Sequence, residues 1–153
     1  PWHAKLGKRL VKTPKLYFID TGLACSLLGI ETSEQVKTHP LRGALFENLI
    51  VAEALKQRFN AGRTDNLYFF RDHQGHEVDL LLESAGACDA FEIKAGRTIN
   101  RDFFKGLDSF AAFAPNLRSR HLVYCGDEGR RERDTSIQAW HAFRIDDQGV
   151  ERP

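Results

Sequence analysis

Residues 77–83 read E-V-D-L-L-L-E and residues 89–96 read D-A-F-E-I-K-A-G, two apolar runs interrupted by acids and one lysine. As neighbouring strands they place Asp79, Glu92 and Lys94 on one face of a sheet, because side chains alternate with a period of two. Two carboxylates beside an ammonium group are typical of a divalent-metal site at which water is activated next to a phosphate. This pair of runs therefore predicts both a β-sheet and a candidate site on it.

The segments around this pair predict a three-strand meander, because the connections are short and contain glycine, as hairpin turns do. The predicted strands are 66–72, 76–83 and 89–96, then 121–126 and a last strand around 137–145, with a charged loop at 127–134. The predicted helices are 21–29, 41–59 and 100–114, with a loop or short helix at 31–40. This order predicts an α/β domain with a central mixed sheet flanked by helices.

The two longer helices are expected to pack against the sheet. In the first helix, apolar residues recur at intervals of three and four, which predicts a buried stripe of Leu45, Leu49, Ala52, Leu55 and Phe59. In the second, helical spacing predicts that the phenylalanines belong to the core: Phe103, Phe104, Phe110 and Phe113.

Composition points to one soluble domain. The chain has 153 residues, 42% of them hydrophobic and 28% charged, and no apolar run approaches the roughly 20 residues of a membrane helix. Its three cysteines are widely spaced and form no C-x-x-C pair, which favours reduced thiols over a zinc knuckle or a disulfide framework. No signal-peptide pattern follows the basic start. We therefore expect a cytoplasmic protein.

The first residues are basic, although the formal net charge of the chain is only +1. Five basic residues occur there without one acid among them: Lys5, Lys8, Arg9, Lys12 and Lys15. Such a run could contact nucleic acid, but a linker that docks against another module has the same composition, and we favour the linker. The sequence begins at Pro1 and contains no methionine, so we expect it to be part of a longer polypeptide.

The candidate site suits Mg²⁺, which takes oxygen ligands from one or two carboxylates and keeps several waters. Asp79 and Glu92 would be the carboxylate ligands, and the backbone carbonyl of Ile93 could complete the protein's share. Lys94, two residues after Glu92, would hold the attacking water or the phosphate oxygens. The alternative role for Lys94 is a salt bridge to Glu92 or Glu77.

Four segments carry a resemblance to a known family: KRLVKTPKLYFIDTGLACSLLG (8–29), RGALFENLIVAEALK (42–56), YFFRDHQGHEVDLLLE (68–83) and FEIKAG (91–96). The chain resembles the PD-(D/E)XK, or restriction endonuclease-like, nuclease superfamily. Within that superfamily it is similar to the domain of unknown function found C-terminal to AAA-type ATPase modules in prokaryotic proteins. The resemblance covers nearly the whole chain as far as Phe110, with the segments in the family's order.

The resemblance implies a restriction endonuclease-like fold over residues 17–153, with residues 1–16 as a basic linker from a missing N-terminal ATPase module. It implies that Glu47 is the helix acid, Asp79 and Glu92 the metal ligands, and Lys94 the motif lysine. The implied activity is Mg²⁺-dependent hydrolysis of DNA phosphodiesters. The alternative is a catalytically inactive module that binds nucleic acid or protein and regulates the attached ATPase.

Departures from the family pattern are visible in the residues. Glu47 stands where a Pro-Asp motif is often quoted, and Val78 replaces the proline before the central aspartate. The chain also has no G-x-x-x-x-G-K-[ST] motif, so ATP would bind only in the missing module.

Two further features have alternative explanations. Glu47 could cap the start of its helix, where an acid is favoured by the helix dipole. Asp72, His73 and His76 could form a zinc cluster, but no fourth ligand has suitable spacing, so we predict ordinary turn residues.

Overall fold

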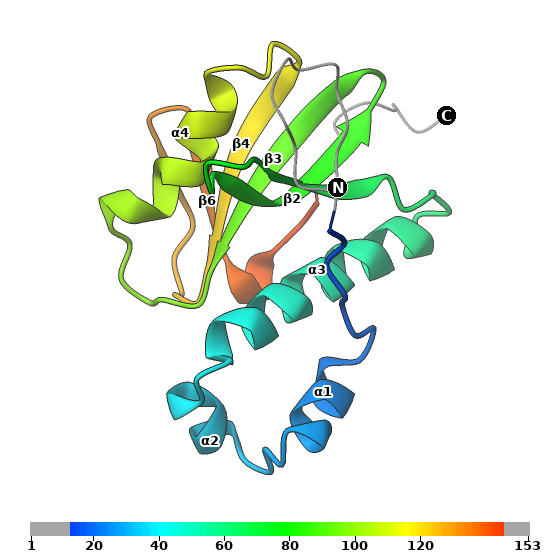
Figure 1. Ribbon diagram of the computed structural model, residues 1–153, viewed down its shortest axis with the longest axis vertical. Coiled ribbons are helices and arrows are strands. Elements are labelled where there is room, and N and C mark those ends of the chain that lie inside the picture. Colours follow the sequence, from blue (N-terminus) through cyan, green and yellow to red (C-terminus); the bar gives the residue numbers. More distant parts are fainter. Residues whose placement is uncertain (1–12, 146–153) are drawn as a thin grey trace.

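The computed structural model describes residues 13–145, which form one mixed sheet with helices against both faces (Figure 1). The strands are β1 (Leu67–Arg71), β2 (Glu77–Ser84), β3 (Ala87–Lys94), β4 (Leu117–Tyr124), β5 (Arg130–Glu132) and β6 (Thr135–Ala139). The helices are α1 (Thr21–Leu27), α2 (Ser33–Thr38), α3 (Arg42–Asn60) and α4 (Lys105–Ala111), with 3₁₀ turns η1 (Arg101–Phe104) and η2 (Trp140–Ala142). The α/β prediction is confirmed.

The sheet has the order β1-β2-β3-β4-β6-β5 and mixes both pairing directions. The predicted meander is present, since β1 pairs antiparallel with β2 and β2 antiparallel with β3. Strands β3 and β4 then run parallel, joined by a crossover that contains η1 and α4. Parallel pairing of β4 with β6 places the last long strand beyond β4.

The turn between β2 and β3 sets the register of the central hairpin. Ser84 pairs with Ala87, so only Ala85 and Gly86 form the loop, and both have positive φ, 52° and 79°. A two-residue turn with two positive φ angles matches the right-handed twist of the flanking strands. The hairpin predicted from the sequence is therefore confirmed, and the structure adds its register.

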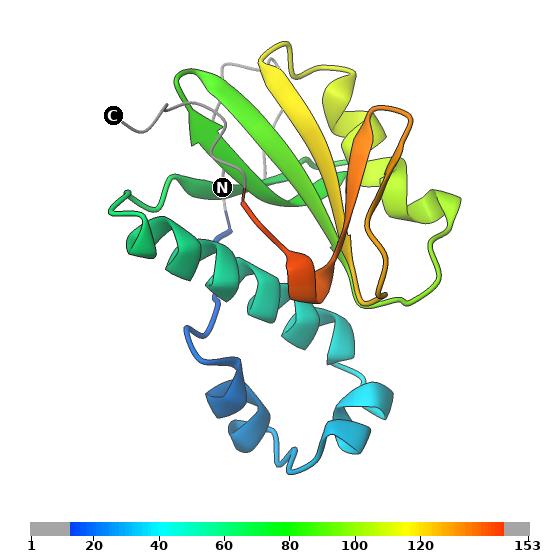
Figure 2. The same ribbon diagram turned by 180° about the vertical axis from the view of Figure 1, so that it is seen from behind.

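Helices α3 and α4 cover opposite faces of the sheet (Figures 1 and 2). Leu80 and Leu82 of β2 face α3, whereas Leu81 between them belongs to the cluster that contains Leu107 and Phe110 of α4. Strand β4 is buried on both faces from His121 to Tyr124, as predicted for its apolar run. The core thus has two layers separated by the central strands.

The predicted stripe of α3 is wrong in part. The residues that pack on the sheet are Phe46, Ile50 and Ala54, while Phe59 is 58% exposed. Helix α3 makes a second apolar contact on another side, where Leu45 packs in the small cluster with Ala24 of α1 and Ile30. A helix with two apolar contacts has more than one possible stripe, so periodicity alone does not select the one that faces the sheet.

Other boundaries also differ from the prediction. The helix expected over 100–114 is divided into η1 and α4, and α4 ends at Ala111. The charged segment 127–134 contains β5, an edge strand that pairs with β6 and whose residues are all exposed, so it shows no apolar alternation. The strand expected around 137–145 ends at Ala139 and continues as η2. Strand β4 begins at Leu117, before the apolar run, because its polar first half is paired through Arg118 and Ser119 with the carboxylate of Asp89.

Of the predicted core phenylalanines, Phe110 is fully buried and Phe103, Phe104 and Phe113 are half-buried against the sheet. The segment expected as a loop or short helix forms α2, with a capping box between Thr32 and Gln35. Across residues 13–145 no helix combines the length and the apolar character needed to cross a bilayer.

Cys88 gives a direct test of the core. It is fully buried, and burial together with the neighbouring Asp89 carboxylate raises the pKa of its thiol to about 11, whereas Cys25 and Cys125 are half-buried. Because the thiolate is the reactive form, native protein treated with iodoacetamide should be alkylated at Cys88 far more slowly than at the other two. Peptide mass spectrometry measures the three rates, with protein in urea as the control. Equal native rates would contradict this packing.

Candidate functional site

Asp79 lies where the central hairpin opens. The pairing between β2 and β3 runs from the turn as far as Leu80 and Phe91, and beyond it the Oδ2 atom of Asp79 accepts a hydrogen bond of 2.8 Å from the backbone N–H of Ile93. The carboxylate thus takes the place of a strand partner and is only 7% exposed. Burial raises the pKa of Asp79, opposed by the nearby charge of Lys94.

Glu92 and Lys94 follow on β3, on the same face as Asp79. The Lys94 ammonium lies 3.5 Å from Asp79 Oδ2 and forms an ion pair with Glu92 Oε1. Burial opposes the charge of Lys94, but the carboxylates of Asp79 and Glu92 outweigh it and raise its pKa. The two acids predicted as ligands therefore converge on a single cation, and the predicted salt bridge of Lys94 is to Glu92.

Glu92 is the most buried acid of the site. It is 5% exposed, and within residues 13–145 its buried Oε2 atom has no hydrogen-bond partner. Burial first, and then the charge of Asp79, raise the pKa of Glu92 to about 8. An unpaired buried carboxylate oxygen costs folding free energy, so it either carries a proton or is available to a ligand.

Gly106 of α4 packs directly against two residues of the site, Glu77 and Glu92. A Cβ atom at this position would stand 2.3 Å from the backbone oxygen of Glu77 and 2.6 Å from Glu92 Oε2. The sequence interpretation missed this residue. The available signal was a glycine inside a predicted helix, where it costs stability relative to alanine and therefore indicates a close packing contact.

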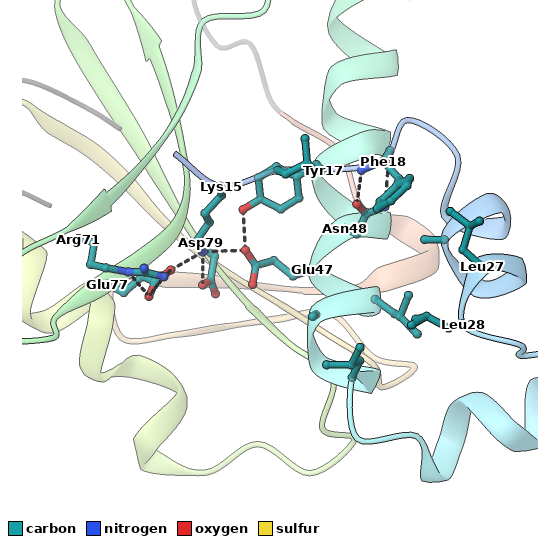
Figure 3. Close-up of a pocket in the computed structure, with 15 residues that line it drawn as sticks. Lys15, Tyr17, Phe18, Leu27, Leu28, Glu47, Asn48, Arg71, Glu77 and Asp79 are labelled. Atoms are coloured by element: carbon teal, nitrogen blue, oxygen red, sulfur yellow. Dashed lines mark hydrogen bonds and ion pairs between the residues drawn. The ribbon is translucent and has the colours of Figure 1, made fainter. Parts of the chain in front are cut away.

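Glu47 projects from α3 toward the same end of the sheet. Its Oε1 atom accepts hydrogen bonds from the Lys15 ammonium at 2.7 Å and from the Tyr17 hydroxyl at 2.6 Å (Figure 3). Capping, the alternative role, is wrong because α3 begins at Arg42 after Leu41, has no side-chain cap, and carries no acid in its first turn. Glu47 is therefore directed into the site.

Lys15 joins Glu47 to the hairpin acids. Its ammonium forms an ion pair with Glu77 and lies 3.9 Å from Asp79 Oδ1 (Figure 3). Burial opposes its charge, but hydrogen bonds to Glu47 and Glu77 raise the pKa of Lys15. Glu77 has a second partner, since Arg71 binds both of its carboxylate oxygens at 2.9 and 3.0 Å.

Comparison with known proteins gives the family. Residues 42–144 match the model of a family described as "Domain of unknown function (DUF4143)". The chain belongs to this family. Residues 1–34 match a separate model, "Domain of unknown function (DUF8612)". The four predicted site residues, Glu47, Asp79, Glu92 and Lys94, lie within the DUF4143 match, whereas Lys15 and Tyr17 come from the segment matched by the other family.

Two curated relatives of this DUF4143 domain are uncharacterized proteins of Mycobacterium bovis and Mycobacterium tuberculosis. Each is 38% identical over 137 residues, which cover 90% of this chain and 30% of the relative. The chain therefore spans less than a third of the length of these relatives. No solved structure matches it significantly.

A cavity of about 570 Å³ opens beside the acids of this DUF4143 domain. One end is charged and contains Lys15, Glu47, Glu77 and Asp79. The other end lies between the strap of residues 15–18, α1 and the start of α3, and its lining is apolar: Leu16, Phe18, Leu27, Leu28 and Leu41. Figure 3 shows the side chains of both ends around this opening.

The oxygen donors fit Mg²⁺ only as a site with few protein ligands. Asp79 and Glu92 converge on one cation position, and the unpaired Oε2 of Glu92 offers a further oxygen. A set of three or more potential ligand side chains arranged around one point is not found among residues 13–145. Two carboxylates with waters are nonetheless a usual way to bind Mg²⁺.

The structure leaves one sequence prediction about ligands untested and confirms another about turn residues. The Ile93 carbonyl stays a predicted ligand, since the site contact of Ile93 described above is through its N–H. Asp72, His73 and His76 are turn residues as predicted: the Asp72 carboxylate accepts hydrogen bonds from the backbone N–H groups of Gln74 and His76, and it pairs with the His76 ring at 2.9 Å. These bonds use its oxygens within the turn and lower the pKa of Asp72 against the opposing effect of burial.

Proposed function

We propose that the chain is a nuclease-like domain of the PD-(D/E)XK superfamily, with a restriction endonuclease-like fold, that hydrolyses DNA phosphodiesters with Mg²⁺. The observation that carries this proposal is the convergence of Asp79, Glu92 and Lys94 where β2 and β3 separate, with Glu47 directed to the same place. In the longer protein the domain would follow an AAA-type ATPase module in the cytoplasm of a prokaryote, and ATP would bind in that module.

Each side chain has a role that its geometry supports. Asp79 and Glu92 would hold Mg²⁺, fixed by the Ile93 N–H and by Lys94. A Mg²⁺ ion bound there supplies Lewis acidity that lowers the pKa of water and offsets charge on the phosphate. Lys94 would donate hydrogen bonds to the attacking water or to the phosphate oxygens, and Glu47 would orient water from the α3 side.

A second function is favoured by one observation. The carboxylates already have ammonium partners within the chain, Lys94 for Glu92 and Asp79, and Lys15 for Glu47. Such internal compensation suits a non-catalytic module that retains the fold and regulates the attached ATPase by binding nucleic acid or protein. Metal-dependent cleavage distinguishes the two functions.

The test uses the full-length protein with single- and double-stranded DNA and RNA in Mg²⁺ or Mn²⁺. Asp79→Asn and Lys94→Ala should each lower cleavage by about 100-fold or more, because they remove a metal ligand and the cation that faces the phosphate. Glu34→Gln and Lys37→Ala are matched controls, since the two residues form an exposed ion pair with each other within α2, and should cleave normally. Equal cleavage by wild type and site variants would refute the enzymatic proposal. Nucleic-acid binding without cleavage would support the regulatory one.

A further inference from the structure

Lys15 occupies a position among acids that a divalent cation would also favour. Its ammonium touches Glu47 and Glu77, lies 3.9 Å from Asp79, and its side chain is only 15% exposed. The carboxylates come from α3 and β2, whereas the lysine comes from the strap that precedes α1. The ammonium of Lys15 thus contacts Glu47 and Asp79, two of the proposed site residues. Lys15 itself lies outside the residues that match the DUF4143 family.

The strap is held in place independently of Lys15. Asn48 of α3, itself buried, accepts a hydrogen bond of 2.7 Å from the Phe18 N–H and donates one of 2.9 Å to the Phe18 carbonyl. The same amide donates to the Thr21 hydroxyl at 2.8 Å, and the Tyr17 hydroxyl donates to Glu47. These contacts fix the strap on α3, so the ammonium of Lys15 is presented to the acids at a high local concentration.

The acids do not need Lys15 for their own compensation. Glu77 keeps its two bonds from Arg71, Glu47 keeps the Tyr17 hydroxyl, and Asp79 keeps Lys94 and the Ile93 N–H. Withdrawal of the ammonium would therefore leave each carboxylate with a partner and open a position beside Glu47 Oε1 and Asp79 Oδ1. A cation of higher charge could take that position.

We propose that Lys15 is a tethered cation that competes with divalent metal for the carboxylate of Asp79, so that metal binding requires the ammonium to leave. This inference rests on the proposed metal site. Lys15 lies within residues 1–34, which match a different family from the segment that carries the proposed metal ligands. Any displacement of residues 13–34 would therefore change the access of metal to the site. The strap is then an autoinhibitory contact between two parts of the polypeptide.

The first test is Mn²⁺ titration of the full-length protein by calorimetry, with wild type, Lys15→Met and Asp79→Asn. Lys15→Met removes the competing charge, keeps the length of the side chain, and should bind Mn²⁺ about tenfold more tightly. Lys37→Met is the matched control, because Lys37 is exposed and its ion pair is with Glu34 of its own helix. Equal or weaker binding by Lys15→Met would overturn the inference.

The second test needs no substitution. Lys15 should be acylated slowly in wild-type protein, and Mn²⁺ should increase its rate of acylation several-fold by displacing the ammonium, while Lys37 stays unchanged. Peptide mass spectrometry reads both lysines in one sample. Unchanged Lys15 reactivity at saturating Mn²⁺ would refute competition. If neither wild type nor Lys15→Met binds Mn²⁺, the proposed metal site itself fails; if both bind equally and Asp79→Asn does not, only the role of Lys15 fails.

Discussion

Gly106→Ala should destabilise the domain by about 3 kcal/mol, although alanine is normally the better residue in a helix. The added methyl group would overlap the backbone oxygen of Glu77 at 2.3 Å and Glu92 Oε2 at 2.6 Å. A backbone carbonyl of a central strand has no room to move without loss of sheet pairing, so α4 must shift outward. Urea unfolding followed by circular dichroism measures the change.

Gly43→Ala is the matched control for this substitution. Gly43 also lies in a helix, α3, but a Cβ atom there meets nothing within 4 Å. That variant should be more stable than wild type, by roughly 0.5–1 kcal/mol, since alanine restricts the unfolded chain without a clash. If both variants gain stability, α4 does not pack closely against Glu77 and Glu92, and this helix does not bury Glu92.

The central hairpin could be predicted because its signals are local. Apolar runs, a short connection that contains glycine and the spacing of Glu92 and Lys94 all act within a short segment, and the structure brings Asp79 to the same cation. The edge strand β5 could not be predicted, since its residues are exposed on both faces and leave no apolar pattern. Apolar patterns in a sequence can predict only the strands that have a buried face.

The position of Lys15 in the site could not be predicted from the sequence. The sequence places this residue in a basic run, and a basic run has the same composition in a linker, a nucleic-acid contact or an ion pair. What distinguishes it is contact with Glu47, 32 residues away, through a strap clamped by Asn48. Neither Lys15 nor Glu47 lies in a sequence pattern that indicates the other as its partner, so only the folded structure shows the contact.

Glu92→Gln should make the metal-free domain more stable by about 4 kcal/mol at pH 8, and the substitution should have little effect near pH 5. The carboxyl of Glu92 has a pKa of about 8 when folded, against an ordinary value of 4.5 in the unfolded chain. Between these values the folded protein binds a proton that the unfolded chain has released. The stability of wild type therefore falls as the pH rises from about 4.5 to about 8, and glutamine removes this loss.

Urea unfolding of both proteins at several pH values, in the presence of a chelator, measures this difference. Glu83→Gln is the control for the loss of one carboxylate, because Glu83 lies at the other end of β2, beside the turn. Lys94 keeps Asp79 as a partner in Glu92→Gln, so the variant does not bury an unpaired ammonium. Parallel pH profiles for wild type and Glu92→Gln would mean that Glu92 ionises normally. A larger gain at high pH would instead show that the fold maintains this carboxylate at a cost in stability, which is common for residues retained for binding.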